Sequence, residues 1–405
     1  MKLIKRESYL ATLSSMKDQN LIKVLTGIRR CGKSTILKMF KDRLLEDGVD
    51  ETQIISLSFE DPNLSTKSYQ DIYNLIIDQL SPDCMNYIFL DEVQLIKEFE
   101  RLLLGLQAKQ NVDLYVTGSN AYLMSSEMAT LLSGRSFEIK VYPFSFKEYV
   151  EAIDAESEEK HSLEEHFQNY LLYGGMPQAI ATYLSDPKLV DQYISGVYET
   201  VIGRDIMDRG KVENRAVLDR IAKYIFENIG SFTSTQNIMN TLNSDGVQKS
   251  FHTISNNITA LRDSFLIYEA NRLHIKGREI LKTQQKYYVV DTGLRSALLG
   301  REANVDTGHL LENVIYFELL RRNKNVWIGK NKNSEIDFVT QDKKGLTTYY
   351  QVALTTKNED TLERELTPLK EIKDFSPRYL ITTDFDEPTY NGIQKVNAYK
   401  WLLDE

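Results

Sequence analysis

Residues 27–35, GIRRCGKST, combine glycines with a lysine and hydroxyl side chains at a spacing that could bind phosphate groups. Gly27, Gly32, Lys33 and Ser34 match the pattern G-x-x-x-x-G-K-[ST]. Glycines let the backbone curl around a phosphate, while backbone amides and the following helix N-terminus donate to its oxygens. Lys33 would reach the β and γ phosphates, and Ser34 would ligate Mg²⁺. The predicted nucleotide contacts are Gly27, Ile28, Arg29, Arg30, Cys31, Gly32, Lys33, Ser34 and Thr35. A glycine-bearing turn in front of a helix is the alternative reading of this stretch.

Two acidic residues end the apolar run YIFLDE, residues 87–92. In a parallel sheet the carboxyl ends of the strands face the ligand crevice, so Asp91 and Glu92 would point toward the phosphates. Asp91 would hold magnesium through water, and Glu92 would polarise the water that attacks the γ-phosphate. The alternative is a strand that simply runs into a polar turn.

A third candidate strand, LYVTGSN, ends in polar side chains that could bond the γ-phosphate or the attacking water. They are Thr117, Ser119 and Asn120. Arg135 follows in LLSGRSF, and a guanidinium can neutralise charge on a transferring phosphoryl group, in its own subunit or in a neighbour's. Asn120 and Arg135 are therefore catalytic candidates, although an arginine after a glycine is commonly just solvated.

The elements that must position these residues follow from hydrophobic patterning. Between residues 21 and 146, short β-rich runs at 21–26, 54–59, 87–92 and 112–119 alternate with helical patterns after Gly32 and around 69–80 and 97–109. Such alternation is typical of βαβ units. The sequence therefore predicts an α/β fold with a parallel sheet and flanking helices.

Residues 216–290 have a different pattern, with three amphipathic helices followed by two strands that a basic turn joins. This order is typical of a winged helix, which contacts DNA or serves as a protein contact module or a lid. Residues 215–286 hold 10 Lys or Arg against 6 Asp or Glu, a balance of +4. Side chains of the third helix that could reach phosphates or bases are Ser250, His252, Ser255, Asn256, Thr259 and Arg262.

Length and composition limit the class of protein. A chain of 405 residues is long enough for three domains. Its net charge of −9 argues against indiscriminate coating of nucleic acid. There is no run of eighteen apolar residues, the N-terminus lacks a signal-peptide core, and the two cysteines form no CxxC pair. We expect a cytoplasmic protein without a zinc site.

The phosphate loop, YIFLDE, VTGSN, LLSGR and YPFSFKEY, in that order, closely resemble AAA+ P-loop ATPases of bacteria and archaea. The chain is similar to the subgroup that joins the ATPase core to a winged helix and an uncharacterised nuclease-like domain. The resemblance implies an AAA+ core at 1–150, a helical lid region at 151–215, a winged helix at 216–300 and a degenerate nuclease-like domain of restriction-endonuclease fold at 301–405. It makes Lys33 and Ser34 the Walker A site, Asp91 and Glu92 the Walker B site, Asn120 a sensor and Arg135 a possible arginine finger.

Glu312, Asp337 and Gln351 resemble the restriction-endonuclease pattern, in which two acids and an E-x-K strand bind magnesium and activate water. Gln351 replaces the expected carboxylate and Ala353 the expected lysine, which makes the site poorer for a hard cation. Lys357 or Lys330 could substitute in space.

These features predict a protein that uses ATP and Mg²⁺, with water as the phosphoryl acceptor, to reposition the winged helix and the C-terminal domain on DNA or on a protein partner. An arginine finger supplied by a neighbour would require a homo-oligomer. A slow ATP-dependent switch or scaffold is the second hypothesis. A magnesium-dependent nuclease gated by ATP is the third.

Overall fold

The computed structural model describes residues 2–121, 132, 134–157, 160–210, 212–275, 277, 279–301, 307–322, 325–331 and 334–404. Lys276 and Arg278 of the predicted basic turn lie outside the described residues, as do the side chains of residues 281–283. The chain forms two units, one of residues 3–143 with 263–265 and one of residues 144–262 with 266–405. In the described part of the chain, no helix has the length and apolar character needed to span a bilayer.

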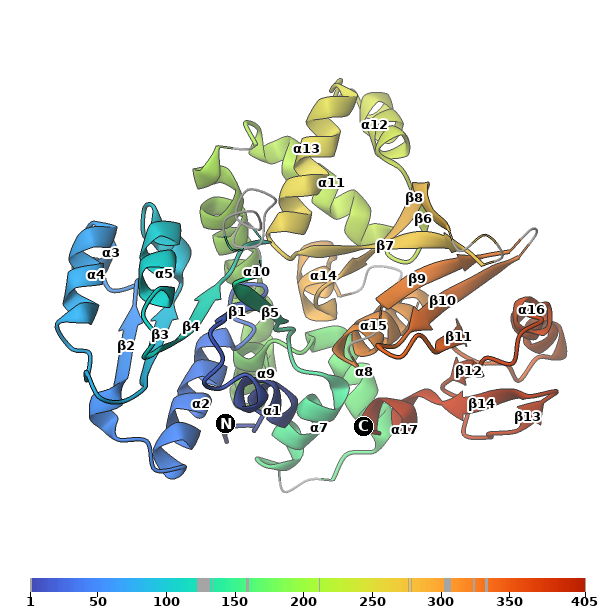
Figure 1. The fold of residues 1–405 in the computed structure, drawn as a ribbon. Coiled ribbons are helices and arrows are strands. Elements are labelled where there is room, and N and C mark those ends of the chain that lie inside the picture. Colours follow the sequence, from blue (N-terminus) through green and yellow to red (C-terminus); the bar gives the residue numbers. More distant parts are fainter. Residues whose placement is uncertain are drawn as a thin grey trace. The chain divides into compact units, whose positions relative to one another are not determined.

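The first unit contains a five-stranded parallel sheet, which confirms the predicted α/β fold. Its strand order is β2-β3-β4-β1-β5, and the strands lie side by side in this order in Figure 1. The strands are β1 (Ile22–Thr26), β2 (Ile54–Ser58), β3 (Asn86–Asp91), β4 (Val112–Gly118) and β5 (Ser136–Lys140). The helices are α1 (Glu7–Ser15), α2 (Lys33–Glu46), α3 (Pro62–Ser65), α4 (Tyr69–Ile77) and α5 (Phe99–Gln107).

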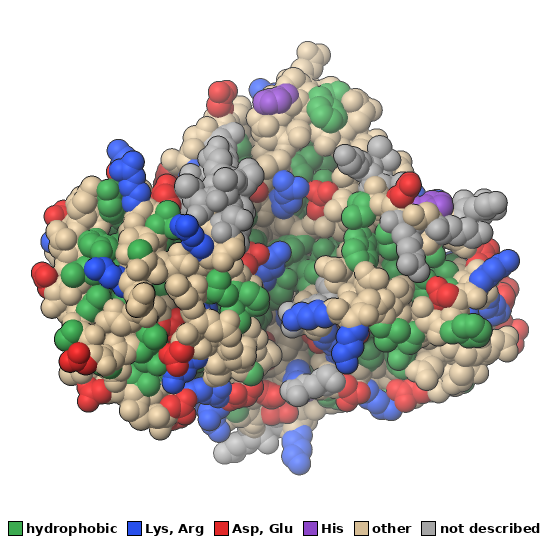
Figure 2. Space-filling view, viewed as in Figure 1, with side chains coloured by type: hydrophobic (Ala, Val, Ile, Leu, Met, Phe, Trp, Pro, Cys, Tyr) green, Lys and Arg blue, Asp and Glu red, His purple; other side chains and the backbone are tan. Residues whose placement is uncertain are grey.

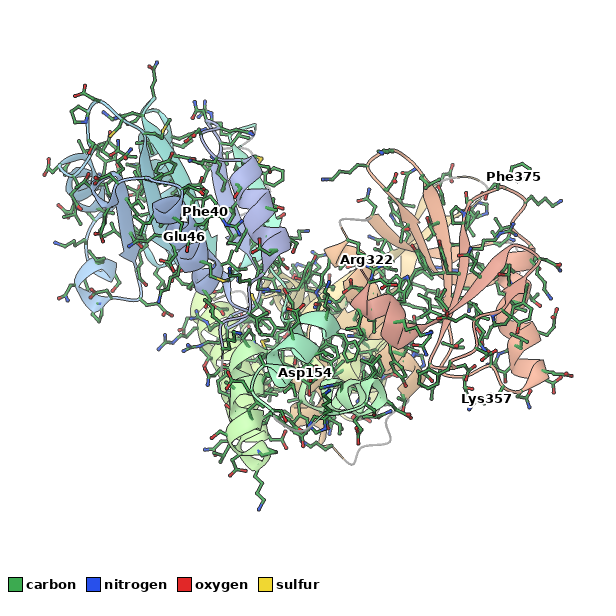
Figure 3. All side chains as sticks on the ribbon, turned by 90° about the horizontal axis from the view of Figure 1, so that it is seen from below. Phe40, Glu46, Asp154, Arg322, Lys357 and Phe375 are labelled. Carbon is green, nitrogen blue, oxygen red and sulfur yellow. The ribbon has the colours of Figure 1, made fainter. Side chains whose placement is uncertain are left out.

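The two faces of this sheet pack against different helices. Because side chains alternate along a strand, Ile88 and Leu90 of β3 lie on one face, in a buried apolar cluster with α4 and α5. Phe89 lies on the other face and stacks on Tyr115 of β4, with ring centroids 5.0 Å apart. Phe40 of α2, labelled in Figure 3, packs 5.1 Å from Tyr115. Helices therefore cover both faces and leave the carboxyl ends of the strands as the place for a ligand.

The second unit begins with helices, as the sequence predicts for residues up to about 230. They are α7 (Phe146–Asp154), α8 (Leu163–Tyr173), α9 (Pro177–Ser185), α10 (Val190–Thr200), a π-helical turn (Val201–Ile206) and α11 (Arg215–Glu227). Gly174 and Gly175 make the turn between α8 and α9, where an added Cβ at Gly175 would lie 2.3 Å from the Phe144 carbonyl oxygen. The amide of Gly175 donates to Asp291 Oδ2 at 2.7 Å. This buried carboxylate thus holds the turn in place.

A nine-stranded sheet occupies the rest of the unit, with strand order β13-β14-β12-β11-β10-β9-β7-β8-β6 (Figure 1). The strands are β6 (Phe232–Thr233), β7 (Ile267–His274), β8 (Glu279–Val289), β9 (Asn325–Lys330), β10 (Glu335–Gln341), β11 (Thr347–Val352), β12 (Arg378–Thr382), β13 (Thr389–Tyr390) and β14 (Ile393–Asn397). The helices are α12 (Thr235–Ser244), α13 (Phe251–Asp263), α14 (Thr292–Leu299), α15 (Thr307–Arg321), α16 (Glu359–Lys370) and α17 (Ala398–Leu403). β7 pairs in parallel with β9, so the hairpin β7–β8 and the C-terminal strands share one sheet.

Candidate nucleotide-binding site

The loop between β1 and α2 has a backbone that requires glycine. Gly27 has a φ of +151°, and a Cβ there would lie 2.1 Å from the carbonyl oxygen of Val141. Gly32, with a φ of +102°, is the N-cap of α2, so the helix begins at Lys33 and directs its free N–H groups and its positive dipole end at the loop. Arg30 also has a positive φ of 68°, an uncommon conformation for a residue with a Cβ. The loop therefore forms a concave, amide-lined surface suited to phosphate.

Lys33 lies across this loop with only 3% of its side chain exposed. Its ammonium donates to the carbonyl oxygens of Gly27 at 2.9 Å and Ile28 at 3.1 Å. Glu92 Oε1 lies 3.8 Å from the same nitrogen. The lysine is thus positioned between the loop and the acidic end of β3, where it can neutralise phosphate charge.

The remaining loop side chains take different roles. Arg29 is buried and its guanidinium lies 3.3 Å from Glu60 Oε1, whereas Arg30 and Thr35 are exposed. Cys31 is fully buried, its Sγ lies 3.4 Å from the Val141 carbonyl oxygen, and burial raises the pKa of its thiol. A protonated, enclosed thiol reacts poorly, so Cys31 serves packing of the loop.

Ser34 and Asp91 come together although 57 positions separate them in the sequence. Ser34 Oγ donates to Asp91 Oδ1 at 2.9 Å, and Thr117 Oγ1 donates to the same oxygen at 2.5 Å. Burial raises the pKa of Asp91, and these two hydrogen bonds oppose that effect. A hydroxyl and a carboxylate oxygen are the hard ligands that Mg²⁺ accepts, so these residues fit the ion that a nucleotide carries.

Glu92 is buried beside Asp91 and has a left-handed backbone, with a φ of 55°. Ser119 Oγ donates to Glu92 Oε2 at 3.1 Å, and Gln94 Nε2 donates to the same oxygen. Burial alone would raise the pKa of Glu92, but the charges of Lys33 and Arg29 and the hydrogen bonds from Gln94 and Ser119 together outweigh it, and the net pKa lies below the ordinary value. Glu92 is therefore an ionised carboxylate, the form that can polarise water.

The sequence prediction assigned Thr117 and Ser119 to phosphate or water, whereas the structure pairs them with the two acids. The sequence did not predict the contact between Gln94 and Glu92. Gln94 lies in the short 3₁₀ turn Val93–Leu95, and this turn, which has no distinct sequence pattern, brings it to Glu92. Asn120 is 4% exposed and follows β4 at the same edge of the sheet as Glu92.

Arg135 directly precedes β5 and lies at the amino ends of the strands, opposite the carboxyl ends that face the phosphate loop. Its carbonyl oxygen accepts from the amide of Ile22, the first residue of β1, at 2.8 Å, whereas the phosphate loop begins after the last residue of β1. Five strand residues span about 16 Å, more than one arginine side chain covers. The structure therefore places Arg135 away from the phosphate loop of its own subunit, and of the two roles left open, action in a neighbour's site stays a prediction.

Two further candidate regions lie in the second unit. On α13, His252 and Asn256 are exposed on the face away from the buried Ile254 and Ile258, while the guanidinium of Arg262 lies 3.2 Å from Glu269 Oε2. The other predicted contact residues of this region are Ser250, which is exposed, and Ser255 and Thr259, which are partly exposed.

Glu312 and Asp337 approach a common neighbour, Lys286, at 2.9 Å and 3.8 Å. Gln351 Oε1 accepts from the amide of Asp337 at 3.4 Å, and its Nε2 donates to Glu365 Oε2 at 2.9 Å. Lys357, labelled in Figure 3, is exposed, so it is Lys286 that supplies the cationic group near these acids.

Comparisons with known proteins agree with a nucleotide-binding fold in the first unit. Residues 19–150 match the family model of an AAA domain, and residues 164–305 match a domain of unknown function. An uncharacterised protein of Haemophilus influenzae is 36% identical over 404 residues, 99% of both chains. An uncharacterised protein of Methanocaldococcus jannaschii, MJ1544, is 26% identical over 94% of this chain and 85% of its own.

Among solved structures, the Walker-type ATPase PABY2304 of Pyrococcus abyssi matches with a TM-score of 0.54 and 15% identity, over 73% of this chain and 96% of that one. This likeness shows a shared fold. The chain therefore belongs to the family of the Haemophilus influenzae protein and carries an AAA domain of the P-loop ATPase fold at residues 19–150.

Proposed function

We propose that the protein binds ATP with Mg²⁺ in the loop of residues 27–35 and hydrolyses it with Glu92 as the group that polarises the attacking water. The observation that carries this proposal is the joining of Ser34 to Asp91 directly beside the ionised, buried Glu92. Magnesium, when bound, supplies positive charge at the β and γ phosphate oxygens. Lys33 adds a second positive charge at the same place, and we assign to Asn120, which is buried just after β4, the role of orienting the water.

The test of nucleotide binding is a titration of wild type and Lys33→Ala with ATP and Mg²⁺. Removing the ammonium should weaken binding by about tenfold or more, because a hydrogen bond to a charged group contributes roughly 1.5–3 kcal/mol. The assignment of residues 27–35 fails if Lys33→Ala binds ATP as tightly as wild type.

A slow ATP-dependent switch is the second candidate function. Ser119 and Gln94 both donate to the carboxylate oxygen Oε2 of Glu92, so these bonds compete with the water that Glu92 would have to hold. ATP binding would then order an assembly while turnover stayed low. A measured turnover well below about 1 s⁻¹ despite tight ATP binding would favour this candidate, because typical enzyme rates lie at or above that value.

We further propose that residues 216–300 form a winged helix whose nucleotide-dependent movement, together with that of residues 301–405, acts on DNA or on a protein. Three helices and the antiparallel set β7-β8-β6 support this. Arg220 and Lys249 line a pocket of about 370 Å³ at the start of α11, and among the described residues neither forms an ion pair. Elsewhere, Figure 2 shows acidic and basic side chains interspersed over the face in view.

DNA contact is tested by fluorescence anisotropy with duplex and single-stranded DNA at several salt concentrations. Removing a phosphate contact should weaken binding to all sequences about equally and reduce the salt dependence by about one unit. Lys249→Ala and Arg220→Ala are the variants that test this. Wild-type protein that binds neither DNA form would direct the search to a protein partner.

A further inference from the structure

A buried ammonium lies among three carboxylates in the second unit. Lys286 of β8 has 7% of its side chain exposed, and its Nζ lies 2.9 Å from Glu312 Oε1 of α15. Two carboxylates of β10 also approach it, Glu335 Oε1 at 3.3 Å and Asp337 Oδ1 at 3.8 Å. These four residues are called the lysine–carboxylate cluster below.

Neighbouring aromatic side chains fix the position of this ammonium. Tyr288 lies two residues along β8, on the same face as Lys286, and its hydroxyl donates to Glu312 Oε1 at 2.6 Å. The Tyr288 ring stacks on Tyr316 of α15 with centroids 4.2 Å apart, so the strand and the helix are held in register. Phe232, paired with Lys286 across β6 and β8, places its ring centroid 5.4 Å from the ammonium.

The charges in the cluster depend on one another. Burial alone would lower the pKa of Lys286, but the three carboxylates outweigh it and keep the lysine as an ammonium. Burial, and next Glu312, raise the pKa of Asp337. An isolated buried ammonium or carboxylate would be strongly unfavourable. One ammonium offsets only part of the charge of three carboxylates, and burial raises the pKa of Glu335 as well as that of Asp337.

The ammonium also fills the volume that a metal would need. A divalent cation binds carboxylate oxygens at about 2.0–2.6 Å, and Nζ lies among the same three carboxylates, 2.9, 3.3 and 3.8 Å from their nearest oxygens. Gln351 does not complete a ligand set, because its Oε1 accepts from the amide of Asp337 and its Nε2 donates to Glu365. With the carboxylates held apart around Lys286, no group of three or more His, Cys, Asp or Glu among the described residues is placed to hold a metal ion, so a metal would require these carboxylates to draw closer.

We propose that Lys286 is the resident cation of this cluster and takes the place of a divalent metal. Glu312, Glu335 and Asp337 then bind Mn²⁺ or Mg²⁺ only when the ammonium is removed. The lysine also joins β8 of the hairpin to α15 and β10, a linkage that needs no metal. This proposal is independent of nucleotide hydrolysis.

The experiment is a calorimetric titration of the full chain with Mn²⁺ in the absence of nucleotide. Wild type and Asp337→Asn should bind the same number of ions, because Asp337 ligates none in the native protein. Lys286→Met should gain one site, Lys286→Arg should gain none because its charge remains, and Lys286→Met with Asp337→Asn should lose the gained site. Loss of one Mn²⁺ site in Asp337→Asn relative to wild type would overturn the proposal.

Thermal unfolding gives a second readout. Removing one partner of a buried ion pair leaves the others uncompensated, so Lys286→Met should lower Tm of the second unit by roughly 10 °C. Mn²⁺ should restore part of this loss in Lys286→Met and leave Tm of wild type unchanged. A Lys286→Met protein that folds but shows neither a new Mn²⁺ site nor this rescue would contradict the proposal. If Lys286→Met does not fold, the comparison of wild type with Asp337→Asn still decides it.

Discussion

At the scale of single residues, the carboxylate of Glu92 is the group on which hydrolysis depends, and its hydrogen bonds set its reactivity. Ser119 and Gln94 stabilise the ionised form of Glu92, but their hydrogen bonds occupy its oxygen Oε2, which would otherwise accept a hydrogen bond from the attacking water. Glu92 has a left-handed backbone, which residues other than glycine adopt only at an energetic cost. Its carboxylate lies close to the ammonium of Lys33.

Gln94→Ala removes one of these competing bonds, and we therefore expect a higher turnover. Gln94 donates to an ionised carboxylate, and a hydrogen bond to a charged group contributes roughly 1.5–3 kcal/mol, so kcat should rise by about tenfold or more while KM for ATP changes little. Steady-state ATP hydrolysis measures this. Combining Gln94→Ala with Glu92→Gln serves as the control, and it should be inactive. A lower kcat in Gln94→Ala would show that Gln94 positions Glu92 rather than restraining it.

The raised pKa of Asp291 predicts that the stability of the folded chain depends on pH. Burial raises its pKa from 3.8 to about 6 in the folded chain, against hydrogen bonds from Gly175 and Leu294 and the charge of Arg321, which lower it. Between these two pKa values the folded state binds more protons than the unfolded state, so the stability that Asp291 contributes is greatest below about pH 4 and falls until about pH 6. The loss amounts to about 3 kcal/mol.

Urea unfolding of wild type and Asp291→Asn at pH values from 4 to 7 measures this effect. The difference in free energy of unfolding, wild type minus variant, should decrease as pH rises through this window. A difference that stayed constant would show that the native carboxyl ionises like one in water, and a difference that increased with pH would show that folding lowers its pKa.

At the scale of elements, the loop between β1 and α2 depends on glycine at position 27. An added methyl group would meet the Val141 carbonyl oxygen at 2.1 Å and would force the loop to move. Gly27→Ala should therefore lower ATP affinity by about tenfold or more, as measured by calorimetry, because the amide donors would be displaced. Gly196→Ala in α10, where a Cβ meets nothing within 4 Å, is the matched control and should bind ATP normally.

Helix α13 is the element that tests the DNA proposal. His252 and Asn256 lie one turn apart and are both exposed, so the double change to Ala should weaken DNA binding by about tenfold without altering ATP hydrolysis in the absence of DNA. Anisotropy with the same DNA measures the loss. Undiminished DNA affinity in the double variant would remove α13 from the interface.

The sequence alone predicts those parts of the site that depend on a short motif or on the position where a strand ends. The loop of residues 27–35, Asp91 and Glu92 follow from a motif and from the apolar runs before them, and the parallel sheet follows from alternation. β5 was not predicted, because its exposed and charged residues lack a buried strand's pattern. Lys286 was not predicted as the partner of Glu312 and Asp337, because it joins them through pairing of strands distant in sequence, which periodicity does not encode.

At the scale of the whole molecule, the position of Arg135 bears on assembly. Because it lies at the ends of the strands opposite the phosphate loop, a catalytic role requires a neighbouring subunit. We expect ATPase activity per subunit to rise with protein concentration and Arg135→Ala to lower it without weakening ATP binding. Mixing Arg135→Ala with Lys33→Ala should recover part of the activity, since a mixed interface restores one complete site. Independence from concentration would exclude this role.

The most direct measurement of the central claim is steady-state ATP hydrolysis by wild type and Glu92→Gln, with and without duplex and single-stranded DNA. The proposed mechanism predicts that wild type hydrolyses ATP and that Glu92→Gln binds ATP with little loss of affinity but hydrolyses it at least about a hundredfold more slowly. A rise in wild-type turnover with DNA would identify residues 216–300 as its sensor. Equal turnover by the two proteins would contradict the assignment of Glu92 and with it the proposed hydrolytic mechanism.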